Sequence, residues 1–328
     1  MPIDYPALPL MTMYVPILKA RKGEFRAIAE LAAPLAPLVM PVFEVVPTAN
    51  GPGKDLWSFS LKVADSVPEG LLIAVDTHRL AVPLSGIHSP LDYVAHDLAA
   101  FGVPMLPVVH LTDPPAQLAV AAHAARLHLG RALVRLTGDP PEGPILAPGL
   151  PPEQCDLLLD MASVLSDRDL TRTEPLVRKY LAWAHRRPWR SITVAAGAMP
   201  AILPRHTPAE IPRWDLALWH RIEDPDVQYG DYGIAHPQTT NPRWRPSPNL
   251  RYTGDTTWQI HRSPDSDMYH LCRAVISSDT WPGPDFSWGD AEIAARAAGQ
   301  PGPGNATNWR AWGTSHHLAH VVHQLTRQ

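Results

Sequence analysis

Short apolar runs that end in a polar residue recur along the chain and predict a series of buried strands. Three of them share one order, a proline, two apolar residues and a polar residue, at 16–19, 41–44 and 107–110. Five further runs lack this proline and cover residues 71–76, 132–135, 156–160, 191–195 and 229–233. Apolar runs of this length are typical of parallel strands that are buried on both faces.

Stretches with helical periodicity separate several of these runs, at residues 25–35, 91–101, 117–129 and 173–185. The polar ends of the runs lie roughly 25 to 36 residues apart, which suits one βα unit each. Eight such units predict an α/β fold, a single (β/α)8 barrel of the TIM type over residues 10–236. An open doubly wound sheet is the structural alternative, but residues 19–23 lack the glycine-rich first turn that it normally carries.

Residues 237–328 differ in composition, because they are rich in Trp, Arg and Pro. We expect them to form an extension packed on the barrel, with a hairpin around Gly254 and Asp255 and a helix at 268–276. Proline-rich stretches at 139–152, 200–213 and 237–248 predict long loops.

The last helix is expected to begin after Ser315, which is a plausible N-cap. An apolar stripe on one side would pack on the barrel. His316, His320 and His323 form the opposite stripe and are expected to face water. The adjacent pair His316 and His317 is therefore a weak candidate for an internal metal site.

Composition limits the classes of partner. The chain has 328 residues, 45% of them hydrophobic, and a net charge of −4, which argues against extended nucleic-acid binding. Arg and Trp in the extension could stack nucleobases, although cation–π packing on the barrel is the more ordinary interpretation.

Cys155 and Cys272 suggest free thiols in a reducing cytosol. Without a signal peptide pattern or a long apolar span, a cytoplasmic protein with no membrane partner is predicted.

The working face of such a barrel lies at the carboxyl ends of its strands. Ionisable residues at these ends are the candidate catalytic groups: Lys19, Glu44, Asp76, His110, Asp160 and Asp231. Arg135 and His78 are candidate ligand-binding residues, although a lone loop histidine such as His78 is more often simply exposed. Loop polarity alone would also explain polar strand ends.

Each candidate role has a structural alternative. Lys19 could be a base or an anion clamp, or it could form an ion pair with Glu44. Glu44 and Asp76 could transfer protons, while Arg135 could hold a phosphate or pair internally. Asp76 and His110 with Asp160 could hold a divalent metal, but no diagnostic spacing supports it, and neither a cofactor motif nor a nucleophile elbow is present. No metal and no cofactor are therefore predicted.

Several motifs together resemble the beta protein family. They are Tyr14-Val15-Pro16-Ile17-Leu18-Lys19 with Gly23-Glu24, Pro41-Val42-Phe43-Glu44, Asp231-Tyr232, Arg251-Tyr252 before Trp258, Phe286-Ser287-Trp288-Gly289-Asp290, and Trp312 with His316-His317. Tyr232 and Arg251 complete the candidate ligand-binding residues. The resemblance implies an accessory protein of phages and bacteria with a role in phage conflict and defence, without an assigned reaction.

Two functions remain open. The first is an enzyme acting on a phosphorylated or nucleotide-like small molecule. The second is a non-catalytic recognition protein that binds a phage or host protein through the barrel rim and the Arg/Trp-rich extension. A ligand at the strand ends would favour the enzyme, whereas a charged cluster fully paired with itself and closed to solvent would favour the recognition protein. The oligomeric state is not predicted.

Overall fold

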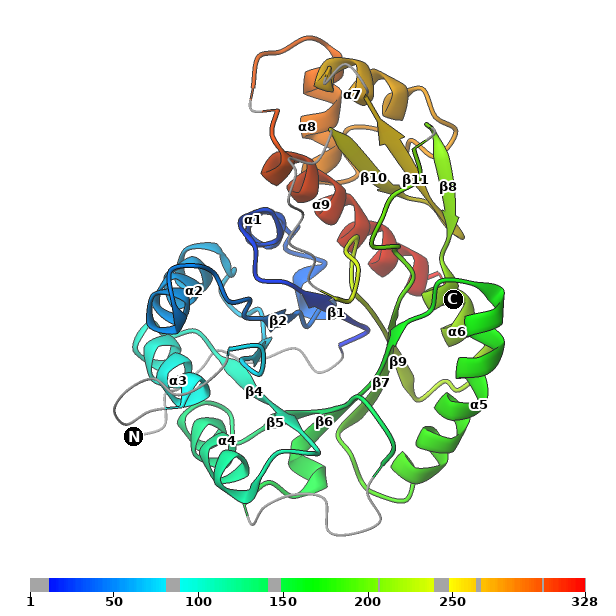
Figure 1. Ribbon diagram of the computed structural model, residues 1–328. Helices are drawn as coiled ribbons and strands as arrows, with labels where there is room; N and C mark the ends of the chain where they lie inside the picture. Colours follow the sequence, from blue (N-terminus) through cyan, green and yellow to red (C-terminus); the bar gives the residue numbers. More distant parts are fainter. Residues whose placement is uncertain are drawn as a thin grey trace.

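Eight parallel strands close into a barrel at the centre of the molecule (Figure 1). The computed structural model describes residues 12–80, 89–140, 149–205, 207–238, 248–263, 267–302 and 304–327. In order around the barrel the strands are β1 (Tyr14–Leu18), β2 (Val42–Glu44), β3 (Ile73–Asp76), β4 (Met105–His110), β5 (Ala132–Leu136), β6 (Cys155–Ser163), β7 (Ser191–Gly197) and β9 (Val227–Asp231). The predicted (β/α)8 barrel is confirmed.

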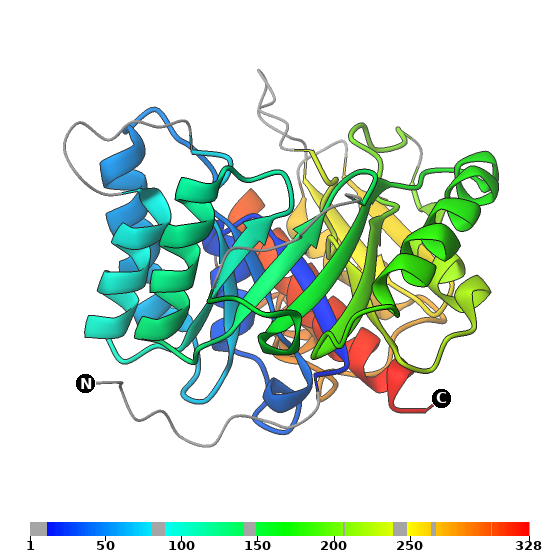
Figure 2. The same ribbon diagram turned by 90° about the horizontal axis from the view of Figure 1, so that it is seen from below.

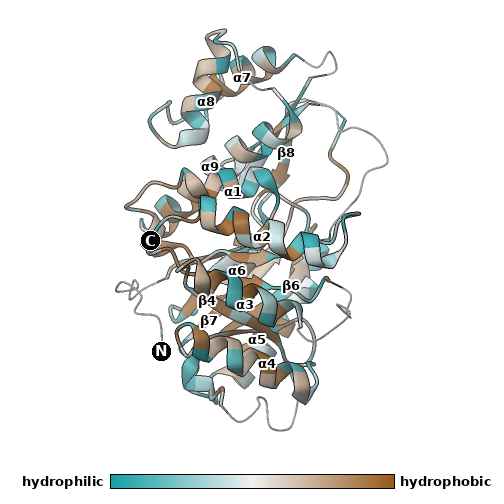
Figure 3. Ribbon diagram, turned by 90° about the vertical axis from the view of Figure 1, so that its left-hand side faces the viewer, coloured by the Kyte–Doolittle hydropathy of each residue, from teal (hydrophilic) through white to brown (hydrophobic). Residues whose placement is uncertain are grey.

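Helices surround the tilted strands on both flanks (Figure 2). They are α1 (Lys22–Ala29), α2 (Pro52–Ser66), α3 (Pro90–Ala100), α4 (Pro115–Leu127), α5 (Asp167–Ala184) and α6 (Trp214–Ile222), with short 3-10 turns η1 (Ala36–Leu38) and η2 (Pro152–Gln154). Ser89 and Ser166 cap α3 and α5, each accepting a hydrogen bond from a backbone N–H of the first turn. Hydrophilic and hydrophobic residues alternate around these helices (Figure 3), as expected where one side covers the strands.

The side chains of each strand alternate between the barrel interior and the surrounding helices. One apolar layer fills the interior and includes Ile17, Val42, Ala74, Val108, Leu133 and Leu158. Two positions further along, the side chain on the same side is polar in all six strands: Lys19, Glu44, Asp76, His110, Arg135 and Asp160. The strand period of two therefore brings these six residues to the carboxyl mouth of the barrel.

The described part of the extension supplies three helices and two strands of a small antiparallel sheet. The sheet has the order β10 (Asn249–Thr253), β11 (Thr257–Arg262) and β8 (Ala209–Pro212), where β8 comes from before the extension, and the first two helices are α7 (Met268–Ile276) and α8 (Trp288–Ala297). The hairpin around Gly254 and the helix at 268–276 are confirmed. The expectation that 200–213 is only a loop is wrong, because β8 pairs with β11.

The last helix, α9 (Ala306–Leu325), begins at the Asn305 cap, so the prediction that it starts after Ser315 is wrong. Ser315 lies in the middle of the helix, where its hydroxyl accepts a hydrogen bond from the backbone N–H of Gly289 (3.1 Å). The prediction that His316 faces water is also wrong, since both His316 and His317 are fully buried. One apolar stripe in the sequence cannot reveal a second covering layer: β10 and α8 cover the side of α9 opposite the barrel (Figure 1).

The apolar stripe of α9 behaves as predicted. Leu318, Val321, Val322 and Leu325 belong to the same core as the barrel strands and helices, and α9 packs along α1 in the ring of helices. A cation–π contact joins α1 of the barrel to α8 of the extension, with the Arg26 guanidinium 5.2 Å from the Trp288 ring centroid. Three of the Arg and Trp residues that make the extension Arg/Trp-rich lie outside the described residues: Arg243, Trp244 and Arg245.

Both cysteines, Cys155 and Cys272, are buried free thiols, as expected. Among the helices of the described ranges, none is both long and apolar enough to cross a membrane.

Candidate functional site

Strand register brings the polar strand ends into contact. Glu44 of β2 is the register partner of Asp76 of β3, and His110 of β4 is the partner of Arg135 of β5. Their side chains point into the barrel mouth, because the inward positions of each strand alternate. The backbone register alone therefore makes four of the predicted site residues neighbours, in two pairs.

Arg135 is the centre of the mouth. Its guanidinium donates hydrogen bonds to Glu44 Oε1 (2.8 Å), Asp76 Oδ2 (2.6 Å) and Asp160 Oδ2 (2.6 and 2.9 Å). Burial alone would lower the pKa of Arg135, but the charges around it, led by Asp160, raise the pKa above its usual value. Arg135 is therefore a permanent cation that holds three carboxylates together.

Lys19 and Arg79 complete the charge balance around Glu44. The Lys19 ammonium donates to Glu44 Oε2 and to the carbonyl of Pro237. Arg79 donates to both Glu44 oxygens (3.0 and 3.3 Å) and to the same carbonyl (3.2 Å). Burial lowers the pKa of Lys19 despite the opposing charge of Glu44. The predicted ion pair of Lys19 with Glu44 is present.

Tyr232 closes the other side of the mouth. Its hydroxyl donates to Asp160 Oδ2 (2.7 Å) and accepts from Arg135 (2.8 Å), and the Lys19 ammonium lies 4.8 Å from its ring centroid. We call the six connected residues the rim network: Lys19, Glu44, Asp76, Arg135, Asp160 and Tyr232. All six are buried, so the rim network is paired with itself and closed to solvent.

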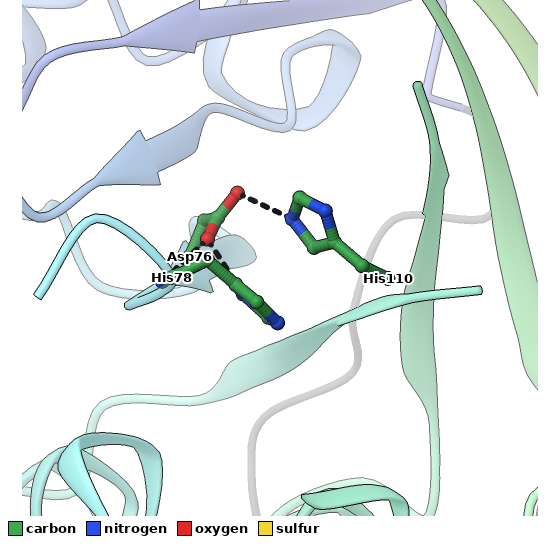
Figure 4. A group of neighbouring side chains, drawn as sticks. All are labelled: Asp76, His78 and His110. Atoms are coloured by element: carbon green, nitrogen blue, oxygen red, sulfur yellow. Dashed lines mark hydrogen bonds and ion pairs between the residues drawn. The ribbon is translucent and has the colours of Figure 1, made fainter. Parts of the chain in front are cut away.

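Two histidines lie beside Asp76 of the rim network (Figure 4), and both are partly exposed. His78 Nδ1 lies 2.9 Å from Asp76 Oδ1, and His110 Nε2 lies 3.2 Å from Asp76 Oδ2. The centroids of the two rings lie 3.8 Å apart, and their planes are tilted by 34°. The other ring nitrogen of His78 lies 2.9 Å from both oxygens of Asp113, which also accepts a hydrogen bond from the backbone of His110 (2.8 Å).

These contacts fix the charge of the carboxylate and of one imidazole. Burial raises the pKa of Asp76, but hydrogen bonds from His110 and His78 and the charge of Arg135 outweigh it and hold the pKa well below its usual range. Burial lowers the pKa of His78, yet the hydrogen bonds to Asp113 and Asp76 raise it to about 9. His78 is therefore protonated at neutral pH.

Two cavities open beside this arrangement. One, of about 310 Å³, is lined by His78 and Asp113 together with apolar residues of α3 and α4. The other, of about 550 Å³, lies between the loops that follow β1 and β2. We call the second the basic cavity, because four cations line it, Lys19, Arg21, Lys22 and Lys62, against the single carboxylate of Asp55.

Backbone strain occurs beside two site residues. Ala20 follows Lys19 with φ of 52°, and Ala162 lies two positions after Asp160 with φ of 53°. Non-glycine residues rarely adopt this left-handed conformation, and its cost is often found at functional sites. Ala162 lies within β6 where its register with β7 shifts, and the Asp160 carboxylate accepts a hydrogen bond from the Ala162 N–H (2.9 Å).

Asp231 lies on the opposite side of its strand from the rim network. Its carboxylate accepts a hydrogen bond from the Tyr14 hydroxyl (2.6 Å) and lies 2.9 Å from His317 Nε2, beneath α9. Tyr229 donates to the same carboxylate (3.1 Å) and to Asp215 (2.5 Å). The structure therefore does not bring Asp231 together with the other candidates.

Arg251 is also separate from the rim network. It lines a small cavity of about 50 Å³ with Arg310 and donates a hydrogen bond to the Ile234 carbonyl (2.5 Å). Burial and the nearby charges of Arg310 and Arg21 lower the pKa of Arg251 to about 10.

Sequence reasoning missed Arg79, Asp113 and three of the cations of the basic cavity, Arg21, Lys22 and Lys62. Arg79 and Asp113 follow strand ends within three residues, which is a signal that could have drawn attention to them. The metal alternative of Asp76 and His110 with Asp160 is not assembled as such, because Arg135 lies between the Asp76 and Asp160 carboxylates and binds both.

The fold and site define a (β/α)8-barrel protein with a buried charged network and a histidine pair at the carboxyl end of its strands. The sequence model of the Beta protein family matches residues 14–323. The chain belongs to the Beta protein family, as the motifs predicted. A comparison with curated proteins gives no match.

Proposed function

We propose that this protein is an enzyme that acts on an anionic small molecule, of the phosphorylated or nucleotide-like class, at the carboxyl end of the barrel. The observation that carries the proposal is a continuous chain of contacts between two cavities. It runs from Lys19 at the basic cavity through Glu44 and Arg135 to Asp76, and from there to His78 at the cavity of about 310 Å³.

The contacts favour a particular division of roles. Lys19 and Arg135 are already bound to carboxylates, so their charge is largely neutralised and they position the mouth. Arg21, Lys22 and Lys62 line the basic cavity and would hold the anion, since cations in a polar cavity attract phosphate.

Proton transfer falls to the histidine pair. His78 and His110 retain side-chain exposures of 27% and 17%, whereas the exposure of Asp76 is 2%. An accessible imidazole held by a buried carboxylate is a common general acid or base, because the carboxylate fixes the ring orientation. Asp76 therefore positions the two rings for proton transfer.

A non-catalytic recognition protein is the second candidate function. It is favoured by one observation, that the rim network is paired with itself and buried. Under this alternative the charged residues stabilise the barrel mouth, and the rim with the Arg/Trp-rich extension binds a phage or host protein.

A ligand screen separates the candidates. Thermal unfolding is measured with phosphate, pyrophosphate, nucleoside mono- and diphosphates and sugar phosphates, and compounds that stabilise the protein are tested for turnover. The enzyme requires a stabilising compound that the wild type converts and His110→Gln converts far more slowly. Full turnover by His110→Gln contradicts the proposed roles, and the absence of any stabilising compound favours the recognition protein.

The family resemblance supplies the proposed biological setting, which is conflict between phages and bacteria. Plaque counts on bacteria that express the protein test this setting. Protection by the wild type that is lost in His110→Gln supports an enzymatic defence role, and equal plaque counts with and without the protein contradict it.

A further inference from the structure

Two imidazoles and one carboxylate converge where β3 and β4 end (Figure 4). Asp76, His78 and His110 each offer one ligand atom, and these atoms all lie within 4.8 Å of one another. We infer that the three residues form a binding site for one divalent transition-metal ion. The inference goes beyond the proposed enzyme: an ion bound here would take the place of the protons between Asp76 and the two imidazoles, so the histidines would then act as ligands and not as proton donors.

The separations between the donor atoms suit a shared ion. The carboxylate oxygens of Asp76 lie 2.9 Å from His78 Nδ1 and 3.2 Å from His110 Nε2. Metal–ligand bonds of about 2.1 Å place neighbouring ligand atoms ~3.0 Å apart in octahedral and ~3.4 Å apart in tetrahedral coordination. Both carboxylate–imidazole distances are close to these values, and the two imidazole nitrogens lie within 4.8 Å of each other.

The ligand types select a class of metal. Imidazole nitrogen suits zinc, iron, nickel and copper, whereas magnesium and calcium prefer oxygen ligands throughout. Two histidines and one carboxylate on one side of an ion form the arrangement of many mononuclear iron(II) and zinc sites. The site is thus assigned to a first-row transition metal rather than to magnesium or calcium.

Outer residues hold the ligands in place. Asp113 accepts from the ring nitrogen of His78 that faces away from Asp76, at 2.9 Å. A carboxylate behind a ligating histidine fixes its ring orientation and raises its basicity as a ligand. Arg135 and the backbone N–H of His78 (2.9 Å) fix the position of the Asp76 carboxylate.

The open side of the site faces accessible space. His78 also lines the cavity of about 310 Å³, and both histidines are partly exposed. Three protein ligands leave coordination positions for water or a ligand, which is typical of catalytic rather than structural metal sites.

The chain offers a matched control. Asp92 with His96 and His123 is a second group of the same composition on α3 and α4, but it is more exposed than the first. His96 has a side-chain exposure of 54%, whereas Asp76 is 2% exposed. Surface groups lack the rigid support that gives high metal affinity, so its removal should leave tight binding intact.

Calorimetric titration of chelator-treated full-length protein with Zn²⁺, and absorption spectra with Co²⁺, test the inference. The wild type should bind one ion tightly. His110→Ala and His78→Ala should each weaken binding by more than about 100-fold, and Asp113→Asn by about 10-fold, because second-shell changes cost less than a lost ligand. His96→Ala/His123→Ala should bind as the wild type does.

Several results would overturn the inference: no tight binding, unchanged affinity in His110→Ala, or loss of tight binding in His96→Ala/His123→Ala. His110→Gln, which can still donate a hydrogen bond to Asp76, separates ligand loss from misfolding when its melting temperature matches the wild type. Lys22→Ala/Lys62→Ala should keep full metal affinity, so failure of the proposed anion site and failure of the metal site give different results.

Discussion

Replacement of Arg135 by Met would test the electrostatic core of the barrel mouth. Met has a similar length but no charge and no hydrogen-bond donor. The wild-type guanidinium donates to Glu44, Asp76 and Asp160 at 2.6 to 2.9 Å, and its side-chain exposure is 4%. In the variant, Asp160 would keep only the Tyr232 hydroxyl and a backbone N–H as partners.

The expected loss follows from the burial of these charges. Removing one partner from a buried ion pair typically costs about 3–5 kcal/mol, because the remaining charge is left without compensation. An unfolding entropy of about 2.1 cal/mol/K per residue gives roughly 0.7 kcal/mol/K for a chain of this length. Arg135→Met should therefore lower the melting temperature by about 4–7 °C.

Differential scanning calorimetry of the metal-free protein at pH 7 measures this shift. Arg172→Ala is the control, because Arg172 pairs with Asp169 at 3.0 Å but is 73% exposed, and exposed pairs contribute about 0–1 kcal/mol. The double variant Arg135→Met/Asp160→Asn should recover part of the loss by removing one unpaired charge. The reasoning is refuted if Arg135→Met melts within about 1 °C of Arg172→Ala.

Two further predictions concern stability. His128 is buried and its ring donates to the Ala95 carbonyl (3.0 Å), and burial lowers its pKa from 6.5 to about 4. The neutral form therefore stabilises the fold above pH 6.5, and about 3 kcal/mol should be lost between pH 6.5 and 4, a loss that His128→Asn escapes. Gly289→Ala should destabilise by about 1–3 kcal/mol, because an added methyl group would collide with the Trp312 backbone and separate α8 from α9.

Denaturant unfolding between pH 6.5 and 4 measures the free energy of unfolding of the wild type and of His128→Asn. The same pH dependence of this free energy in both proteins would contradict the assignment of His128 as a buried neutral group. For the glycine, Gly138→Ala is the matched control, because no atom of the described residues lies within 4 Å of the position of its added methyl group. Equal stability of the two alanine variants would contradict the close approach of α8 and α9.

The barrel could be predicted because each strand carries its own signal, an apolar run that ends in a polar residue. The alternation of inward and outward side chains along each strand carries a further signal, because it decides which residue at a strand end points into the barrel. Asp231 stands at a strand end, yet Gly230 and Tyr232 are the inward positions of that segment, and so Asp231 points under α9. Counting alternate residues from the buried layer would have chosen Tyr232 and rejected Asp231.

Features made by distant segments could not be predicted. β8 is four residues long, and its partner β11 begins about 45 residues later, beyond any local periodicity. The burial of His316 depends on the Asp290 carboxylate at 3.0 Å and the Thr253 carbonyl at 2.9 Å, which reach it from α8 and β10. The charge on His78 depends on Asp113, which comes from another loop.

Anion binding at the carboxyl end of the barrel is the central claim, and calorimetry with the most stabilising compound of the phosphate panel tests it most directly. The wild type is compared with Lys22→Ala/Lys62→Ala and with Lys54→Ala, an exposed lysine of α2 that does not line the basic cavity. The account predicts binding at least about 10-fold weaker in the double variant, because two cations near an anion contribute about 1–2 kcal/mol together, and unchanged binding in Lys54→Ala. Equal affinities in all three proteins, or no binding by the wild type, would contradict it.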